Sequence, residues 1–145
     1  MMRMALHVAH RGRPSPNPYV GAVVARDGEI IATGYHRAAG QAHAEVDALK
    51  KLKGDASGVT MYVTLEPCAH QGRTGPCADA LIEAGVKRVV IGCLDPVPGH
   101  GGGAERLREA GIEVEVGVCG PEAEALIADF RKHNLQGLPF VTLKA

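Results

Sequence analysis

Hydrophobic residues recur along the chain with two periods, one typical of helices and one typical of strands. Residues 2–11 carry apolar side chains at helical spacing and are followed by Gly12-Arg13-Pro14, which predicts a short helix that ends there. Residues 20–26 and 29–35 are two β-rich runs joined by Asp27-Gly28, a dipeptide that favours a two-residue hairpin turn. The chain is therefore predicted to begin with a helix and an antiparallel hairpin.

Predicted helices and strands alternate through the rest of the chain. Further helices are expected at residues 43–52, 77–84, 104–110 and 121–134, and further strands at 59–65, 88–93, 113–118 and 139–143. This order favours an α/β fold, a three-layer α/β/α sandwich. Its mixed central sheet of about five strands would begin with the hairpin and continue through right-handed crossovers. No linker or internal repeat interrupts residues 1–145, so we expect a single domain.

Composition and charge narrow the class of protein. With 46% hydrophobic and 22% charged residues, the chain of 145 residues is typical of a globular domain. Its 16 basic side chains balance 16 acidic ones, so no excess positive charge favours a nucleic acid partner. No apolar run is long enough to cross a membrane, and the N-terminal segment is too polar for a signal peptide. We therefore expect a cytoplasmic location and no membrane partner.

The cysteines suggest metal binding or catalysis rather than disulfides, because the cytoplasm is a reducing compartment. Cys68 follows a predicted strand, while His43 and Cys77 each open a predicted helix. One His and two Cys can hold one Zn²⁺ ion per chain, and three protein ligands leave the fourth tetrahedral position for water, as in catalytic zinc sites. The helix start also predicts a lowered pKa for the Cys77 thiol. Cys93 and Cys119 are instead expected to be packing residues.

Glu45 lies two residues beyond His43, in the first turn of the same predicted helix. From there its carboxylate can reach a metal-bound water without binding the metal, and can carry protons between water and substrate. An H-x-E sequence or a P-C sequence alone is common in proteins. Their order here, with two helix starts and a strand end in suitable places, predicts a zinc-dependent hydrolytic deaminase with Glu45 as its catalytic residue.

The H-A-E sequence at residues 43–45 and the later P-C…C resemble the cytidine/deoxycytidylate deaminase superfamily, whose signature is H-x-E…P-C-x-x-C. This chain instead places a longer segment between its two cysteines. That segment, within TLEPCAHQGRTGPCADALIEAGVKRVV, resembles the deaminase domain of the bifunctional riboflavin-biosynthesis deaminase/reductase, as do SPNPYVGAVV and GYHRAAGQAHAEVDAL. The resemblance covers nearly the whole chain and implies a cytidine-deaminase-like fold.

The resemblance also implies a substrate and the residues that bind it. The substrate would be 2,5-diamino-6-(ribosylamino)-4(3H)-pyrimidinone 5′-phosphate, which loses its 2-amino group as ammonia. The implied substrate-binding residues are Asn17, His36, His70, Arg73, Thr74 and Asp95. His70, Arg73 and Thr74 would receive the ribose phosphate, and Asp95 would bind the ribose hydroxyls. For Asn17 a turn-forming role is the alternative, and for His36 the end of a strand.

Departures from the family pattern leave alternatives open. Val97 replaces an Asn in the family's D-P-N-P segment, so another pyrimidine, purine or natural-product nucleotide is the alternative small-molecule substrate. The chain stops at Ala145, where the bifunctional proteins continue into a reductase, so we expect a deaminase domain without a reductase domain. It is either a monofunctional deaminase, with the reductase on a separate chain, or a domain excised from a longer protein. We also expect a homo-oligomer, with a separate reductase as a candidate partner. An inactive, zinc-stabilised partner subunit of such a reductase is the alternative from another functional class.

Overall fold

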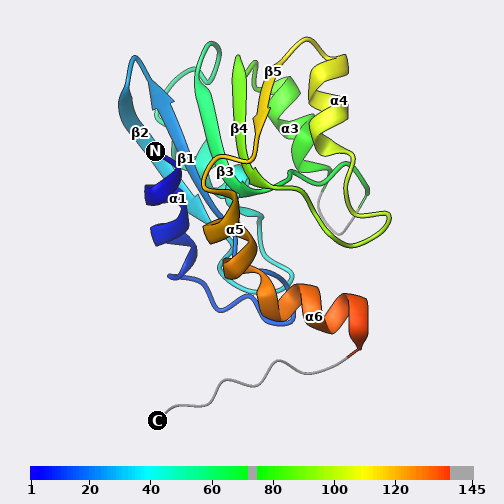
Figure 1. Cartoon of the computed structure of the whole chain (residues 1–145). Helices are drawn as coiled ribbons and strands as arrows, with labels where there is room; N and C mark the ends of the chain where they lie inside the picture. The colour runs from blue at the N-terminus through cyan, green and yellow to red at the C-terminus, as the bar shows by residue number, and fades with distance from the viewer. Residues whose placement is uncertain (72–74, 138–145) are drawn as a thin grey trace.

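The computed structural model describes residues 1–71 and 75–137, whose helices and strands are shown in Figure 1. The helices are α1 (Met2–Ala9), α2 (Ala44–Lys51), α3 (Cys77–Glu83), α4 (Gly103–Glu109), α5 (Gly120–Leu126) and α6 (Ala128–Gln136). The strands are β1 (Gly21–Arg26), β2 (Glu29–Tyr35), β3 (Thr60–Leu65), β4 (Arg88–Cys93) and β5 (Glu113–Val116). The strand predicted at residues 139–143 lies outside the described residues.

The strands form one mixed sheet in the order β2-β1-β3-β4-β5. β1 pairs antiparallel with both β2 and β3, whereas β3, β4 and β5 run parallel. In the turn between β1 and β2, Asp27 and Gly28 have positive φ and Arg26 pairs with Glu29, which confirms the predicted two-residue hairpin. The predicted mixed sheet is therefore confirmed for the part of the chain that the structure describes.

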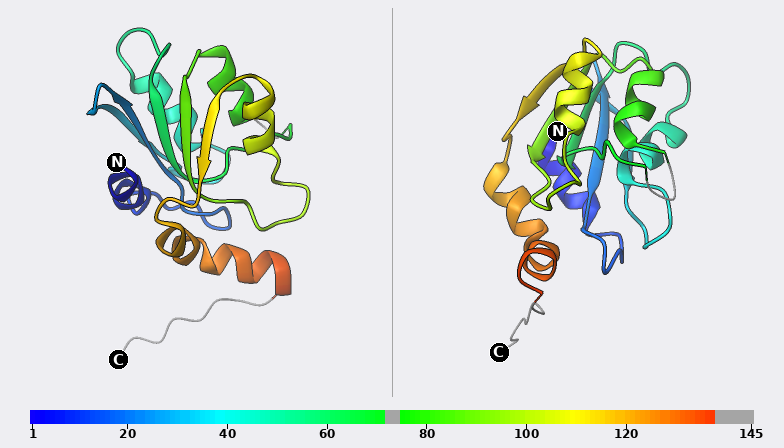
Figure 2. Two further views of the ribbon diagram at one scale, coloured as in Figure 1. Left: turned by 45° about the horizontal axis from the view of Figure 1, so that its top comes forward. Right: turned by 90° about the vertical axis from the view of Figure 1, so that its right-hand side faces the viewer.

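Helices cover both faces of the sheet (Figure 2). α1 and α5 lie against one face, and α2, α3 and α4 lie against the other. Because both faces are covered, the first five residues of β1 are all buried: Val23 packs with Ala5 of α1, while Ala22 and Val24 belong to the core on the α2 side. The predicted three-layer α/β/α sandwich is thus confirmed. No helix in residues 1–71 and 75–137 is long and apolar enough to cross a membrane.

Two predicted elements differ from the structure in ways that have a clear physical cause. The helix predicted at residues 121–134 is two helices, because the Ile127 N–H donates to the Glu124 carbonyl in a tighter turn and α6 then runs in a new direction (Figure 1). Apolar residues keep helical spacing across this turn, so the sequence pattern does not show it. The strand predicted at residues 113–118 ends at Val116, because Gly117 has a φ of +99° and turns the chain.

Gly34 lies in β2 at a close approach between α2 and the sheet. A β-carbon added there would lie 2.2 Å from the Ala44 carbonyl oxygen and 2.4 Å from the Ala48 nitrogen, both backbone atoms of α2. Gly34→Ala is therefore expected to push α2 away from the sheet and to lower the free energy of unfolding by about 1 to 3 kcal/mol, measured by urea denaturation. Gly75→Ala is the control, because nothing lies within 4 Å of its added β-carbon. Equal stability of the two variants would contradict this packing.

Candidate active site

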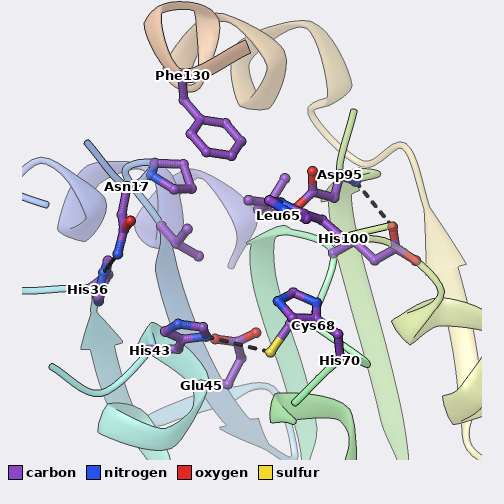
Figure 3. Close-up of a pocket in the computed structure, with 13 residues that line it drawn as sticks. Asn17, His36, His43, Glu45, Leu65, Cys68, His70, Asp95, His100 and Phe130 are labelled. Carbon is purple, nitrogen blue, oxygen red and sulfur yellow. Dashed lines mark hydrogen bonds and ion pairs between the residues drawn. The ribbon is translucent and has the colours of Figure 1, made fainter. Parts of the chain in front are cut away.

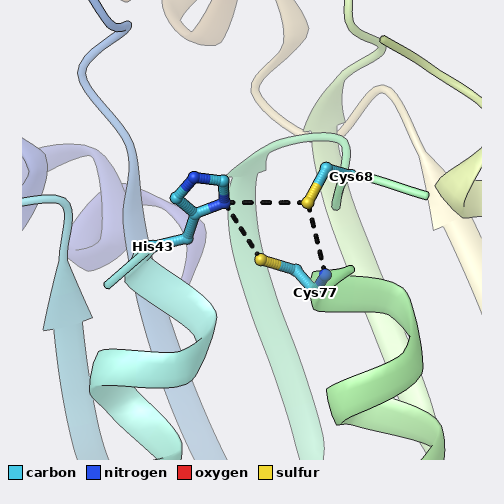
Figure 4. A group of neighbouring side chains, drawn as sticks. All are labelled: His43, Cys68 and Cys77. Atoms are coloured by element: carbon cyan, nitrogen blue, oxygen red, sulfur yellow. Dashed lines mark hydrogen bonds between the residues drawn. The ribbon is translucent and has the colours of Figure 1, made fainter. Parts of the chain in front are cut away.

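Three side chains that can bind a metal meet where β3 ends and two helices begin. His43 precedes α2, Cys68 follows β3, and Cys77 is the first residue of α3. Their ligand atoms all lie within 4.8 Å of one another. The His43 Nδ1 atom is 3.1 Å from the Cys77 Sγ atom and 3.7 Å from the Cys68 Sγ atom (Figure 4). The fold thus brings together one nitrogen and two sulfurs from three separate segments.

The arrangement of these three donor atoms fits a zinc ion. Tetrahedral zinc with bonds of about 2.0 Å to nitrogen and 2.3 Å to sulfur holds those ligand atoms about 3.5 Å apart. The two nitrogen–sulfur distances, 3.1 and 3.7 Å, lie on either side of that value. Two cysteine sulfurs, bound as thiolates, and one imidazole are also donors that suit zinc. The cluster is therefore a candidate zinc site with three protein ligands.

The two cysteines of this cluster differ in acidity. A hydrogen bond from the Cys77 side chain lowers the pKa of Cys68 to about 4, and the same hydrogen bond raises the pKa of Cys77. The Cys77 backbone N–H also donates to the Cys68 Sγ atom at 3.2 Å. The first amide of α3 therefore stabilises a thiolate at Cys68, so the prediction of a lowered pKa for Cys77 is wrong. Hydrogen bonding to Cys68 in turn raises the pKa of His43.

Glu45 lies in the first turn of α2, and only 3% of its surface is exposed. Burial raises the pKa of its carboxyl to about 7. A carboxyl with a pKa near 7 can both accept and donate a proton at neutral pH. The side chain lies beside His43 and Cys68 on the floor of a pocket (Figure 3). Position and pKa are both suited to the proton transfer expected of this residue.

The pocket above the cluster has a volume of about 170 Å³. Its polar lining residues are Asn17, His36, His43, Glu45, Glu66, Cys68, His70, Asp95 and His100, and its apolar lining includes Leu65 and Phe130. Four of the predicted substrate-binding residues are therefore gathered here, from loops and strand ends far apart in the sequence (Figure 3). The other two, Arg73 and Thr74, lie outside the described residues.

On one side of the pocket, His36 sets the orientation of the Asn17 amide. The His36 Nδ1 atom is 3.0 Å from the Ala42 carbonyl oxygen, which can only accept, so Nδ1 carries the proton. The unprotonated Nε2 atom then accepts from the Asn17 Nδ2 group at 3.1 Å. Burial lowers the pKa of His36, in agreement with a neutral ring. With its amide nitrogen held by His36, Asn17 has a carbonyl oxygen that accepts no hydrogen bond from residues 1–71 or 75–137.

The opposite side of the pocket carries His70, Asp95 and His100 (Figure 3). The rings of His70 and His100 stack with their centroids 5.2 Å apart. The His100 Nδ1 atom is 4.0 Å from the Asp95 Oδ2 atom. Burial raises the pKa of the Asp95 carboxyl. This side therefore offers two imidazoles and one carboxyl to a ligand.

Several residues that line the pocket, His100 and Phe130 among them, were not predicted from the sequence. His100 lies in a glycine-rich segment that has no periodicity and matches no motif. Phe130 belongs to α6, far along the chain from the H-A-E motif, and it reaches the pocket only because of the fold (Figure 3). Val97, which replaces the family's Asn, packs against the apolar cluster that contains Leu65 and Phe130, so an apolar side chain suits its surroundings.

Known proteins are similar to this chain in sequence and in fold. The family model for the cytidine and deoxycytidylate deaminase zinc-binding region matches residues 1–93. The riboflavin biosynthesis protein RibD of Aquifex aeolicus is 53% identical over 99% of this chain and 41% of that protein. The chain thus spans less than half of the length of this relative.

Two solved structures are similar in fold. One is a diaminohydroxyphosphoribosylaminopyrimidine deaminase/5-amino-6-(5-phosphoribosylamino)uracil reductase from Thermotoga maritima, with 46% identity and a TM-score of 0.93 over 96% of this chain and 41% of that one. The other is the dCMP deaminase of cyanophage S-TIM5, with 25% identity and a TM-score of 0.64 over 79% of this chain and 92% of that one. With its His/Cys/Cys cluster and its shared fold, the chain belongs to the zinc-binding cytidine and deoxycytidylate deaminase family.

Proposed function

We propose that this chain hydrolyses the 2-amino group of 2,5-diamino-6-(ribosylamino)-4(3H)-pyrimidinone 5′-phosphate, releasing ammonia and leaving a pyrimidinedione. The observation that carries the proposal is the buried Glu45, with a pKa of about 7, beside a zinc-compatible cluster on the floor of a pocket. The choice of substrate is supported by the similarity to the Thermotoga maritima protein, whose name specifies a deaminase of this pyrimidine. The reaction belongs to riboflavin biosynthesis, the pathway named in the Aquifex aeolicus relative.

In this proposal, three residues of the pocket floor bind zinc and a fourth transfers protons. His43, Cys68 and Cys77 would hold one zinc ion per chain. A zinc ion bound there would lower the pKa of a water molecule. The Glu45 carboxylate takes a proton from the attacking water and delivers it to the ring nitrogen next to C2. As the C2–N bond breaks, Glu45 takes the second proton of that water from the new C2 hydroxyl and gives it to the departing amine. Water thus supplies the new carbonyl oxygen, and the nitrogen leaves as ammonia.

The two sides of the pocket would orient the substrate. The free carbonyl oxygen of Asn17 suits a hydrogen-bond donor on the pyrimidine, and His36 fixes that oxygen in place. On the opposite side, His70 and Asp95 are proposed to bind the ribose phosphate and its hydroxyls, and the stacked His100 extends the surface that they offer. Arg73 and Thr74 keep the phosphate-binding roles that the sequence resemblance implies.

Ammonia release from the proposed substrate tests this function. The zinc-loaded protein is expected to deaminate the diaminopyrimidine ribotide with a kcat/KM at least about 10²-fold above that for dCMP, cytidine or guanine, because a site built for the polar groups of one substrate discriminates against others that lack them. A chelator is expected to abolish the reaction, and added zinc to restore it. A higher kcat/KM for dCMP would reject the proposed substrate.

A nucleotide such as dCMP is the second candidate substrate. It is favoured by Val97, which removes an amide from the family pattern, and by the similarity to the cyanophage dCMP deaminase. The same substrate panel decides between the two nucleotides. Stoichiometric zinc without turnover of any member of the panel would instead favour an inactive partner subunit of a reductase.

We further propose that residues 1–145 form one deaminase domain, and that copies of the chain assemble into a homo-oligomer. The protein would act in the cytoplasm, where a reductase converts its product. All four cysteines are free, which suits a reducing compartment. The name of the Thermotoga maritima protein pairs a deaminase with a reductase, which supports the choice of the next enzyme. Size-exclusion chromatography with light scattering measures the oligomeric state.

A further inference from the structure

Glu66 is the first residue after β3 and precedes Cys68 by two residues. None of the proposed steps uses its carboxylate. Only 8% of its surface is exposed. Its Oε1 atom accepts from the backbone N–H groups of Gly102 at 3.0 Å and Ala104 at 3.1 Å, and its Oε2 atom accepts from the N–H of Asp95 at 3.1 Å. One buried side chain thus accepts three backbone hydrogen bonds from another part of the chain.

These three amides lie at the two ends of a single loop. The loop, residues 94–102, leaves β4 and leads into α4, and it carries both Asp95 and His100. Asp95 lies near its start, Gly102 is its last residue, and Ala104 is the second residue of α4, directly after it. Glu66 therefore holds both ends of the loop that forms one side of the pocket.

Backbone contacts of Glu66 and Pro67 also join this segment to β4 and to the start of α4. The Glu66 N–H donates to the Cys93 carbonyl oxygen at 2.9 Å, so the residue is held at the end of β4. A β-carbon added at Gly103 would lie 1.7 Å from the Pro67 carbonyl oxygen, so the start of α4 lies directly against the residue before Cys68. The loop and the Cys68 segment therefore form one packed unit, with the Glu66 carboxylate at its centre.

We propose that Glu66 is a positioning residue that sets the loop of residues 94–102, and with it Asp95 and His100, against the substrate pocket. The inference concerns substrate binding and rests on the proposed function for its kinetic part only. Glu66 itself acts through Asp95 and His100 rather than on the reacting atoms. Its loss therefore affects the binding of the ribose phosphate end and leaves proton transfer by Glu45 in place.

A carboxylate is required for this task because it can only accept hydrogen bonds. Three N–H donors converge on its two oxygens. In Glu66→Gln, an NH₂ group replaces one oxygen and faces at least one N–H donor, so that hydrogen bond is lost without a change in side-chain size. The substitution therefore tests the hydrogen bonds separately from packing.

The first measurement is amide hydrogen exchange in the zinc-loaded protein, and it requires no substrate. Glu66→Gln is expected to accelerate exchange of the Asp95, Gly102 or Ala104 amides tenfold or more, with the amides in the centre of β3 unchanged. Gly103→Ala, which would push the same loop away from Pro67, is expected to accelerate exchange at the same positions. Unchanged exchange at all three amides of Glu66→Gln, or equal acceleration throughout the sheet, would overturn the proposal.

The second measurement is steady-state kinetics with the diaminopyrimidine ribotide. For Glu66→Gln, KM is expected to rise about tenfold, which corresponds to about 1.4 kcal/mol, while kcat stays within about threefold and the zinc content is unchanged. Glu109→Gln, at the exposed end of α4, is the control and is expected to match the wild type. A fall in kcat with an unchanged KM would overturn the positioning role. If the wild type does not act on the ribotide, the proposed function fails, while hydrogen exchange still decides the role of Glu66.

Discussion

Replacing Glu45 by glutamine is expected to reduce ammonia release by about 10² to 10⁴-fold without loss of bound zinc. The side chain is 3% exposed, and glutamine has nearly the same shape, so the packing of α2 is preserved. What the substitution removes is a titratable group with a pKa of about 7, raised by burial next to the cluster. The expected loss is therefore in kcat, measured by ammonia release, with zinc content measured by atomic emission on the same samples.

The control for this prediction is Glu83→Gln, because Glu83 is an exposed carboxylate at the end of α3. It is expected to keep wild-type turnover and zinc. Retained turnover in Glu45→Gln would remove Glu45 from the proton-transfer role. Loss of zinc from Glu45→Gln would show that the carboxylate supports the metal cluster instead.

The sequence predicted the features that depend on local patterns. The two-residue hairpin followed from Asp27-Gly28, because this dipeptide adopts the positive φ values that such a turn requires. The alternation of helices and strands predicted the three layers, because each element must bury its apolar face. The H-A-E motif and the two P-C sequences identified the residues that the fold gathers into the His43, Cys68 and Cys77 cluster.

Features that depend on contacts between distant segments could not be predicted. The acidity of Cys68 depends on a backbone amide at the start of α3, which no spacing in the sequence specifies. Glu66 is an ordinary acidic residue in the sequence, and its importance comes from three amides that β4 and α4 bring to it. Phe130 reaches the pocket because α6 changes direction after Ile127, at a position where helical spacing of apolar residues is unbroken.

Cys77→Ser is expected to abolish both stoichiometric zinc binding and deamination. The Cys77 side chain is fully buried, and its Sγ atom lies 3.1 Å from the His43 Nδ1 atom, so it faces the cluster and not solvent. Serine has nearly the same size but replaces the soft sulfur donor, which loses its proton when zinc binds, with a hydroxyl that is a poor zinc ligand at neutral pH. Even changes at residues that only support zinc ligands typically cost 10–100-fold in affinity, so loss of a ligand is expected to exceed about 10²-fold.

The matched control is Cys119→Ser, which makes the same chemical change at a half-buried cysteine before α5, away from the cluster. Zinc affinity is measured by competition with a chromogenic chelator, and ammonia release is measured after zinc is added in excess. Cys119→Ser is expected to bind one zinc per chain and to turn over as the wild type does. Because zinc binds only the folded cluster, it is also expected to raise the melting temperature of the wild type and of Cys119→Ser but not that of Cys77→Ser. Tight zinc binding by Cys77→Ser, with the same rise in melting temperature, would exclude Cys77 as a ligand.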